Sequence, residues 1–181
     1  MLARGLAGHA APPGPPRPGA GLCYSSSVDY SSRLAEIPLF AEMSPRELEA
    51  LAPLIRRQHV PAGSRVFSEG DPGDAMYLID KGRIRISKVL SGVGEEALAI
   101  LGPGGVFGEM AVLDGGQRSA DAIAQEDAEL FVLERERFLG LLKDDKDLAF
   151  HVLSAIVRTL VGRLRAMNDK VLAFYVLAQF C

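Results

Sequence analysis

The 181-residue sequence has no tryptophan, two cysteines and three histidines, and each shortage excludes a class of function. Cys23 and Cys181 lie at opposite ends, so they form neither a disulfide framework nor a cysteine metal site. His9, His59 and His151 lack a second histidine or a carboxylate at the spacing of metal ligands, and we interpret His59 and His151 as surface or interface residues. No Walker loop, Gly-x-Ser-x-Gly motif or plausible Cys–His pair is present. The sequence therefore predicts no catalytic residue, no metal and a protein that is not an enzyme.

A large charge of one sign and a long apolar run are also missing. The net charge of −3 argues against a nucleic-acid binder that works through bulk charge. No apolar run is long enough to span a membrane. With 48% hydrophobic and 24% charged residues, the composition is that of an ordinary globular protein. We expect a soluble, cytoplasmic chain.

Residues 1–33 are predicted to form a disordered tail rich in glycine, proline, alanine and serine. They show no hydrophobic periodicity, and no acidic residue precedes Asp29. Such a segment cannot bury enough apolar surface to offset the entropy lost on ordering. A targeting peptide is the less favoured alternative, because prolines interrupt any amphipathic helix and no long apolar centre exists.

One domain is predicted over residues 34–144, and it begins with helical signals. Ser44, Pro45 and Glu47 form a capping-box pattern with proline at the first helical position. Apolar residues then recur at helical spacing, so we expect this helix to end near Arg57.

Short strands are predicted to follow, because twelve of the nineteen glycines fall within residues 63–116 and separate short apolar runs. The predicted strands are Arg65–Phe67, Met76–Ile79, Arg83–Val89, Ala97–Leu101, Ala120–Ala124 and Glu129–Leu133. Many short strands at near-even spacing indicate a β-sandwich, jelly roll or barrel. A parallel sheet is disfavoured, because no helical pattern separates the strands.

After a short helix over Glu134–Leu142, residues 145–176 are predicted to form one long helix, followed by a tail over residues 177–181. The helix has an unbroken a/d seam over four heptads. The seam residues are Phe150, Leu153, Val157, Leu160, Leu164, Met167, Val171 and Phe174. A second apolar set lies beside the first turns only, namely Ala149, Val152, Ala155 and Ile156. We expect the start of the helix to pack on its own domain and the seam to form a parallel homodimer, the alternative being a core helix of a larger bundle.

The strongest site signal lies within residues 104–120. Glu109 can begin a helical turn after Gly108, and the free N–H groups at the start of such a turn favour an anion. A glycine-containing loop can return Arg118 to the same turn, where its guanidinium would complete a phosphate site. An acid beside phosphate is unfavourable unless the ligand also offers a hydroxyl donor, as a ribose does. The pattern predicts a phosphorylated sugar or nucleotide, the alternative being a structural ion pair between Glu109 and Arg118.

Residues 37–171 resemble the cyclic-nucleotide-binding domain family of bacterial catabolite-activator-type regulators, kinase regulatory subunits and gated channels. The motifs that carry the resemblance are Phe107-Gly108-Glu109, Arg118-Ser119-Ala120, Glu69-Gly70-Asp71, Met76-Tyr77-Leu78-Ile79 and Lys81-Gly82. The resemblance implies a mainly β fold with flanking helices: an eight-stranded antiparallel jelly-roll β-roll followed by a long C-terminal dimerisation helix.

The resemblance also implies a ligand, cAMP in preference to cGMP, and the residues that bind it. Glu109 would accept a hydrogen bond from the ribose 2′-hydroxyl, and Arg118 would pair with the phosphate. The other implied ligand-binding residues are Gly108, Met110, Ala111, Ser119, Ala120, Ile86, Val89, Met167 and Asn168. The last two would cap the base from the long helix, from either subunit of a dimer.

We therefore expect a dimeric sensor that signals to an unknown effector protein through ligand-driven repositioning of the long helix. Only a few residues follow that helix, whereas a helix-turn-helix domain needs about 50 more, so nucleic acid is not an expected partner of this chain. Two alternatives are a truncated or degenerate transcription regulator of the catabolite-activator type and a scaffold that binds no ligand.

Overall fold

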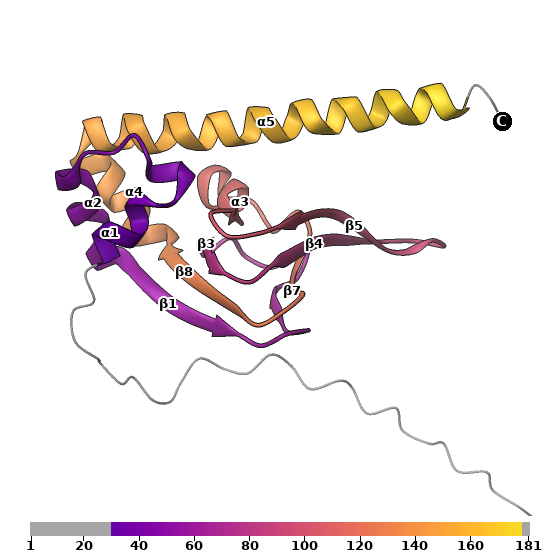
Figure 1. The fold of residues 1–181 in the computed structure, drawn as a ribbon, viewed down its shortest axis with the longest axis horizontal. Coiled ribbons are helices and arrows are strands. Elements are labelled where there is room, and N and C mark those ends of the chain that lie inside the picture. The colour runs from indigo at the N-terminus through magenta and orange to yellow at the C-terminus, as the bar shows by residue number, and fades with distance from the viewer. Residues whose placement is uncertain (1–29, 179–181) are drawn as a thin grey trace, which may run out of the picture.

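The computed structural model describes residues 30–178, apart from the side chains of residues 174 and 177, and it contains a β-roll with short helices packed at one end and a long helix that runs along the roll (Figure 1). The strands are β1 (Ile55–Val60), β2 (Arg65–Phe67), β3 (Ala75–Lys81), β4 (Ile84–Leu90), β5 (Gly94–Leu101), β6 (Val106–Phe107), β7 (Asp121–Ala124) and β8 (Ala128–Glu134). The α-helices are α1 (Tyr30–Ala35), α2 (Pro45–Leu51), α3 (Glu109–Asp114), α4 (Arg135–Asp144) and α5 (Lys146–Ala178). Two short 3-10 helices are η1 (Pro38–Phe40) and η2 (Ala52–Leu54).

The eight strands form two antiparallel sheets with four strands each. One sheet has the order β1-β8-β3-β6 and the other the order β2-β7-β4-β5. Strands β4 and β5 form a hairpin, whereas most other neighbours in the sheets are far apart in the sequence. The predicted eight-stranded antiparallel jelly roll with a long C-terminal helix is confirmed.

Helix α2 begins with the predicted capping box. The Glu47 N–H donates to Ser44 Oγ over 3.4 Å, and the Ser44 N–H donates to Glu47 Oε2 over 2.8 Å. Pro45 occupies the first position of the helix, where its missing N–H has no intrahelical partner to lose.

The predicted end of this helix is wrong. Helix α2 ends at Leu51 rather than near Arg57. Pro53 has no backbone N–H with which to continue the α-helical hydrogen bonds, so the chain passes through η2 instead. Ile55 then opens β1 and pairs with Leu133 of β8, so an apolar residue at helical spacing belongs to a strand.

Each of the six predicted strands is present with slightly different ends, but β1 and β6 were not predicted. Strand β1 was hidden by the helical spacing that continues across Pro53. Strand β6 has only two residues and forms through pairing with β3, so it carries no periodic signal of its own.

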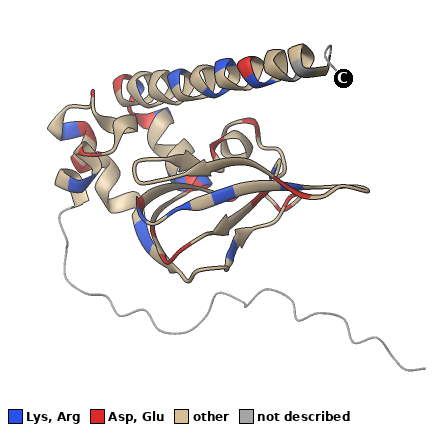
Figure 2. Cartoon of the chain, turned by 45° about the vertical axis from the view of Figure 1, so that its right-hand side comes forward, with Lys and Arg blue, Asp and Glu red and all other residues tan. Residues whose placement is uncertain are grey.

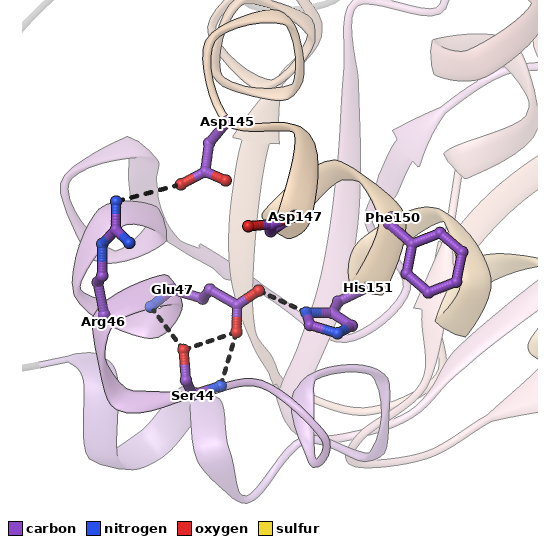
Figure 3. A pocket seen from close by; sticks show the side chains of 7 residues that line it. All are labelled: Ser44, Arg46, Glu47, Asp145, Asp147, Phe150 and His151. Atoms are coloured by element: carbon purple, nitrogen blue, oxygen red, sulfur yellow. Dashed lines mark hydrogen bonds and ion pairs between the residues drawn. The ribbon is translucent and has the colours of Figure 1, made fainter.

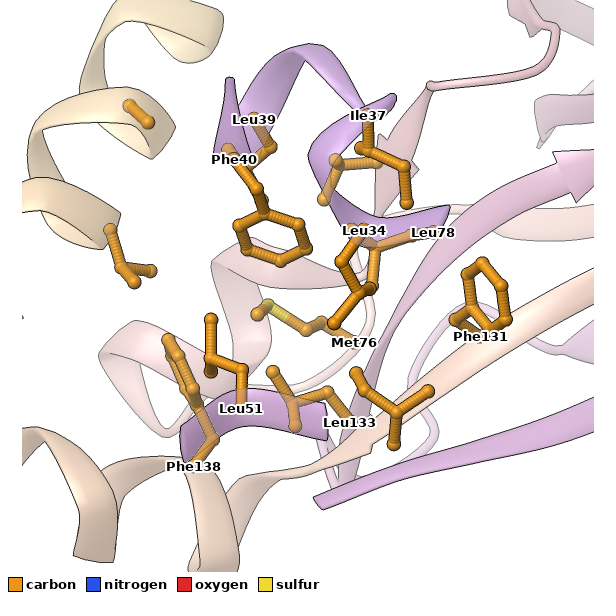
Figure 4. Close-up of a cluster of buried hydrophobic side chains, with 14 of the residues drawn as sticks. Leu34, Ile37, Leu39, Phe40, Leu51, Met76, Leu78, Phe131, Leu133 and Phe138 are labelled. Atoms are coloured by element: carbon orange, nitrogen blue, oxygen red, sulfur yellow. The ribbon is translucent and has the colours of Figure 1, made fainter. Parts of the chain in front are cut away.

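Two apolar clusters form the core, and β3 contributes to both because its side chains alternate between the faces of the sheet. Met76 and Leu78 face the helices and lie among the side chains of Figure 4, with Leu34, Phe40, Leu51, Phe131 and Phe138. Tyr77 and Ile79 face the inside of the roll, where Ile84, Phe107, Leu130 and Val132 also lie. The first cluster joins the helices to the roll, and the second sets the shape of the roll interior.

Helix α5 has two apolar faces near its start, as predicted. Val152, Ala155 and Ile156 are buried in the cluster between helices and roll together with Leu148, whereas Ala149 is only partly buried. The seam face is exposed at Phe150, Leu153, Val157, Leu164, Met167 and Val171. Leu160 instead packs partly against the core of its own chain, and the Phe174 side chain lies outside the described residues. Dimerisation through this face stays a prediction.

Two predicted boundaries shift. Helix α1 begins at Tyr30, inside the segment expected to be a disordered tail, because the Tyr30 ring packs edge-on against Phe131 with centroids 5.8 Å apart. Helix α5 continues to Ala178, past its predicted end at residue 176. The rest of the predicted tail, residues 1–29, lies outside the described residues. Within residues 30–178, no helix has both the length and the apolar character needed to cross a membrane.

Candidate functional site

Helix α3 is the centre of the candidate site, and glycines bound it at both ends. Gly108 caps its N-terminus with φ 75°, and Gly115 caps its C-terminus with φ 74°, both in the left-handed region. A Cβ atom at Gly108 would lie 2.6 Å from Arg118 Nη1. The chain can therefore turn from β6 into α3 beside the Arg118 guanidinium only with glycine at this position.

Replacing Gly108 with alanine is expected to lower the free energy of unfolding by about 1–2 kcal/mol, because alanine is strained at this φ and its Cβ displaces Arg118. Chemical denaturation measures this loss. The matched control is Gly140→Ala inside α4, where no atom lies within 4 Å of an added Cβ and φ is not positive. That control should be neutral or more stable, since alanine favours helix. An equal loss in both variants would contradict this account of Gly108.

Arg118 is buried and held in place from three sides. Its side chain is 1% exposed, and it donates from Nη1 to the Gly108 carbonyl and from Nη2 to Asp74 Oδ1, each over 2.9 Å. The guanidinium carbon lies 4.3 Å from the centroid of Phe67, within the range of a cation–π contact. The buried Arg118 Nε has no hydrogen-bond partner among the described residues. A buried guanidinium with a free donor is ready to bind an anionic ligand.

Glu109, the first residue of α3, is also buried, with its side chain 3% exposed. Its Oε1 accepts a hydrogen bond from Arg163 Nη1 of α5 over 2.6 Å. Arg163 also donates to the Val106 carbonyl, so it fastens the middle of α5 to both β6 and α3. The alternative of an ion pair between Glu109 and Arg118 is wrong, since each residue pairs with a different partner.

A cavity of about 90 Å³ lies between these two charged groups, under α5. Eight residues predicted to bind a ligand line it: Gly108, Glu109, Met110, Ala111, Arg118, Ser119, Ala120 and Ile86. Three further lining residues were not predicted, namely Phe67, Phe107 and Arg163. The cavity thus combines an arginine, a carboxylate and the start of a helix, the set that suits a phosphate next to a hydroxyl.

Comparison with known proteins shows the family to which the chain belongs. The family model of the cyclic nucleotide-binding domain matches residues 57–145. A solved cyclic nucleotide-binding domain from Methylobacillus flagellatus is similar, with 30% identity and a TM-score of 0.73, and the match covers 79% of this chain and 83% of that one. The chain belongs to the cyclic nucleotide-binding domain family.

Two curated relatives are longer than this chain and carry the names of regulatory proteins. The cyclic AMP receptor protein of Thermus thermophilus is 40% identical over 68% of this chain and 57% of its own length. A cAMP-dependent protein kinase regulatory subunit of Aspergillus niger is 36% identical over 66% of this chain and 28% of its own length. The chain therefore spans little more than half of the first relative and under a third of the second.

Three residues that the family resemblance suggested do not line the cavity. Val89 is 67% exposed near the tip of the β4–β5 hairpin, and its odd spacing from Ile86 in a two-residue repeat places it on the other face of the strand. Met167 and Asn168 lie a turn beyond Arg163 on α5, and Met167 borders a separate apolar hollow with Val171. Their contact with a ligand from a second subunit stays a prediction.

Of the three lining residues that were not predicted, Phe107 directly precedes Gly108, whereas Phe67 and Arg163 come from elements distant in the sequence. Phe107 was noted only as part of a motif, but it stacks on Tyr77 with ring centroids 5.1 Å apart, and Phe67 packs beside it. Burial of Tyr77 raises the pKa of its hydroxyl. These three rings form the wall behind Arg118. Arg163 lies in α5 and belongs to no local sequence motif, so its contact with Glu109 can be seen only in the folded chain.

No metal site was predicted, and the two described histidines pair with carboxylates instead. Among residues 30–178, no group of three or more histidine, cysteine or acidic side chains is arranged to hold a metal ion. His59 pairs with Glu129 on the outside of the roll, with 3.1 Å between Nδ1 and Oε1. His151 pairs with Glu47 where α2 meets α5.

Proposed function

We propose that this protein is a cyclic-nucleotide sensor and that its ligand is cAMP. The observation that carries the proposal is the pair of buried, oppositely charged groups, Glu109 and Arg118, on either side of the Gly108 turn. Burying charged groups is costly unless they are paired; here Glu109 pairs with Arg163 and Arg118 pairs with Asp74, and both line one cavity beside the start of α3. Such a site suits a ligand that carries both a phosphate and a ribose hydroxyl.

Each group has a role in the proposed complex. Arg118 pairs with the cyclic phosphate, whose remaining oxygens accept from the free N–H groups of α3. Glu109 accepts the hydrogen bond of the ribose 2′-hydroxyl. Ser119 is exposed beside Arg118 and adds a hydroxyl to the phosphate side, and Ile86 borders the base. Preference for adenine is supported by the two curated relatives, whose names both refer to cAMP.

The size of the cavity couples ligand binding to α5. A volume of about 90 Å³ is well below the roughly 300–1,000 Å³ of typical small-molecule sites. Arg163 already donates a hydrogen bond to Oε1 of Glu109, the carboxylate that the ribose hydroxyl would bind. We infer that ligand entry displaces Arg163 and so releases α5 from β6 and α3. The ligand shifts α5 only as far as its affinity differs between the two helix positions.

The protein forms a dimer, and an effector protein binds its α5 helices. The exposed apolar face of α5 supports pairing with a second copy. Figure 2 shows acidic and basic residues interspersed over helices and strands without a face of one sign in that view, which fits a protein partner better than nucleic acid. A non-enzymatic role fits the two regulatory relatives.

A thermal-shift screen with cAMP, cGMP, cyclic dinucleotides and 5′-AMP tests the proposal. A ligand at about 100 times its Kd stabilises by about 2.7 kcal/mol, which raises the Tm of a chain of this size by roughly 5–10 °C. We expect this shift with cAMP, a smaller one with cGMP, and none with 5′-AMP, which lacks the cyclic phosphate. No shift with any cyclic nucleotide at millimolar concentration would favour the ligand-free scaffold instead.

A further inference from the structure

The first turns of α5 are fastened to α2 by a second buried carboxylate, Glu47, which lies far from the nucleotide cavity. The Glu47 Oε2 atom accepts hydrogen bonds from the backbone N–H and the hydroxyl of Ser44, over 2.8 Å and 2.7 Å. The other oxygen, Oε1, lies 2.6 Å from His151 Nδ1 on α5 (Figure 3). One side chain thus caps α2 and holds α5, across 104 residues of sequence.

The two partners differ in their access to water. The Glu47 side chain is 9% exposed, whereas that of His151 is 43% exposed. A buried carboxylate is stable only while its oxygens have donors, and Oε1 has His151 as its hydrogen-bond donor among the described residues. The imidazole can exchange its proton with solvent through a hollow of about 330 Å³ beside it. The buried Glu47 carboxylate therefore depends on His151, an imidazole that loses its positive charge as the pH rises.

Besides Glu47, acidic groups lie near the imidazole on α5 and on the segment that leads into α2. On α5 itself Asp147 lies one turn before it, and Asp145 precedes α5. Glu42, before α2, pairs with Arg158 of α5 over 2.6 Å. Arg46 of α2 lines the same hollow and lies 4.0 Å from Asp145. These carboxylates favour the imidazolium form of His151.

The pKa shifts agree with this arrangement. The hydrogen bond from His151, followed by those from Ser44, lowers the pKa of Glu47 to about 2. The hydrogen bond to Glu47 raises the pKa of His151, with smaller contributions from Asp147 and Glu42. A raised histidine pKa gives stability that is fully present below the unfolded value of 6.5 and is lost as the pH rises through the folded value. The lowered pKa of Glu47 gives stability that is lost only as the pH falls below 4.5 towards 2.

We propose that Glu47 and His151 form a proton-dependent clamp that holds the first turns of α5 to α2 and loosens when the imidazole loses its charge. Leu148 and Val152 stay buried on either side of His151, so the helix remains docked and only the mobility of its first turns changes. The clamp makes the first turns of α5 respond to pH, and none of its residues lines the cavity that Arg163 borders.

Hydrogen exchange of the nucleotide-free chain tests the clamp, with protection factors corrected for the intrinsic effect of pH. Between about pH 6 and about pH 9, on either side of the ordinary histidine pKa, we expect the protection of amides 148–156 to fall severalfold in the wild type. In His151→Gln, which keeps a donor but cannot become charged, the protection of these amides should change little over the same range. Equal changes in both proteins would overturn the proposal.

A second variant tests the same contact without relying on hydrogen exchange. Glu47→Gln removes the carboxylate charge and replaces one carboxylate oxygen with an amide nitrogen, so the side chain keeps its size and shape. NMR titration of the His151 ring should show a lower midpoint in this variant than in the wild type. An unchanged midpoint would also overturn the proposal, because it would show that Glu47 does not hold the imidazolium.

Discussion

Replacing Arg118 with leucine is expected to weaken cAMP binding by on the order of 100-fold or more. The guanidinium would make two charge-assisted hydrogen bonds to the phosphate, each worth roughly 1.5–3 kcal/mol, and leucine makes neither. Arg118 is also the buried residue that joins the Gly108 carbonyl to Asp74, so the variant loosens the turn that presents the helix N–H groups. Isothermal titration calorimetry with wild-type and variant chains measures the loss.

Two further variants make this result specific. Arg118→Lys keeps the positive charge without the planar fork, so its affinity should fall between those of the wild type and the leucine variant. Arg83→Leu removes an exposed arginine that pairs with Glu126 outside the cavity, and it should bind as the wild type does. Circular dichroism checks that each variant is folded. Unchanged affinity in a folded Arg118→Leu chain would contradict the assignment of the site.

The double variant Leu164→Asp with Val171→Asp is expected to be monomeric at concentrations where the wild type is a dimer. Both side chains lie on the seam face one heptad apart, and they are 59% and 48% exposed in the single chain. A dimer would bury these four positions, so charged replacements should weaken association by on the order of 1,000-fold or more. Leu160 is left unchanged, because it packs partly against the core of its own chain.

Light scattering after size exclusion measures the mass of each variant. The matched control is Val176→Asp, since Val176 is also exposed on α5 but lies five residues after Val171, off the seam. This control should remain dimeric. A dimer in the double variant, or a monomeric wild type, would show that the seam face is not the interface.

The parts of the fold that the sequence revealed are those with a local cause. The alternation through Ile84 and Ile86 indicates a strand because one face of β4 is buried in the roll. The two apolar stripes of α5 were separable because only Val152, Ala155 and Ile156 repeat beside the first turns. In contrast, β1 follows Pro53 with an apolar spacing that also suits a helix, and β6 is defined only by its pairing with β3.

The candidate site shows the same division between local and distant signals. Residues 108–120 form one continuous turn, helix and loop, so their chemistry could be inferred from order and spacing alone. Arg163 lies 54 residues from Glu109, and Asp74 lies 44 residues from Arg118. Neither pairing has a local pattern, because each depends on how α5 and the start of β3 pack around residues 108–120.

The central claim is that a cyclic nucleotide binds in the cavity between Glu109 and Arg118 and displaces Arg163 of α5 from Glu109. Hydrogen exchange of the wild-type chain with and without saturating cAMP tests this claim most directly. We predict increased protection of residues 106–120, and changed protection of residues 157–167 around Arg163, as the ribose replaces Arg163 on Glu109. Unchanged protection of residues 106–120 in the presence of cAMP would contradict the account.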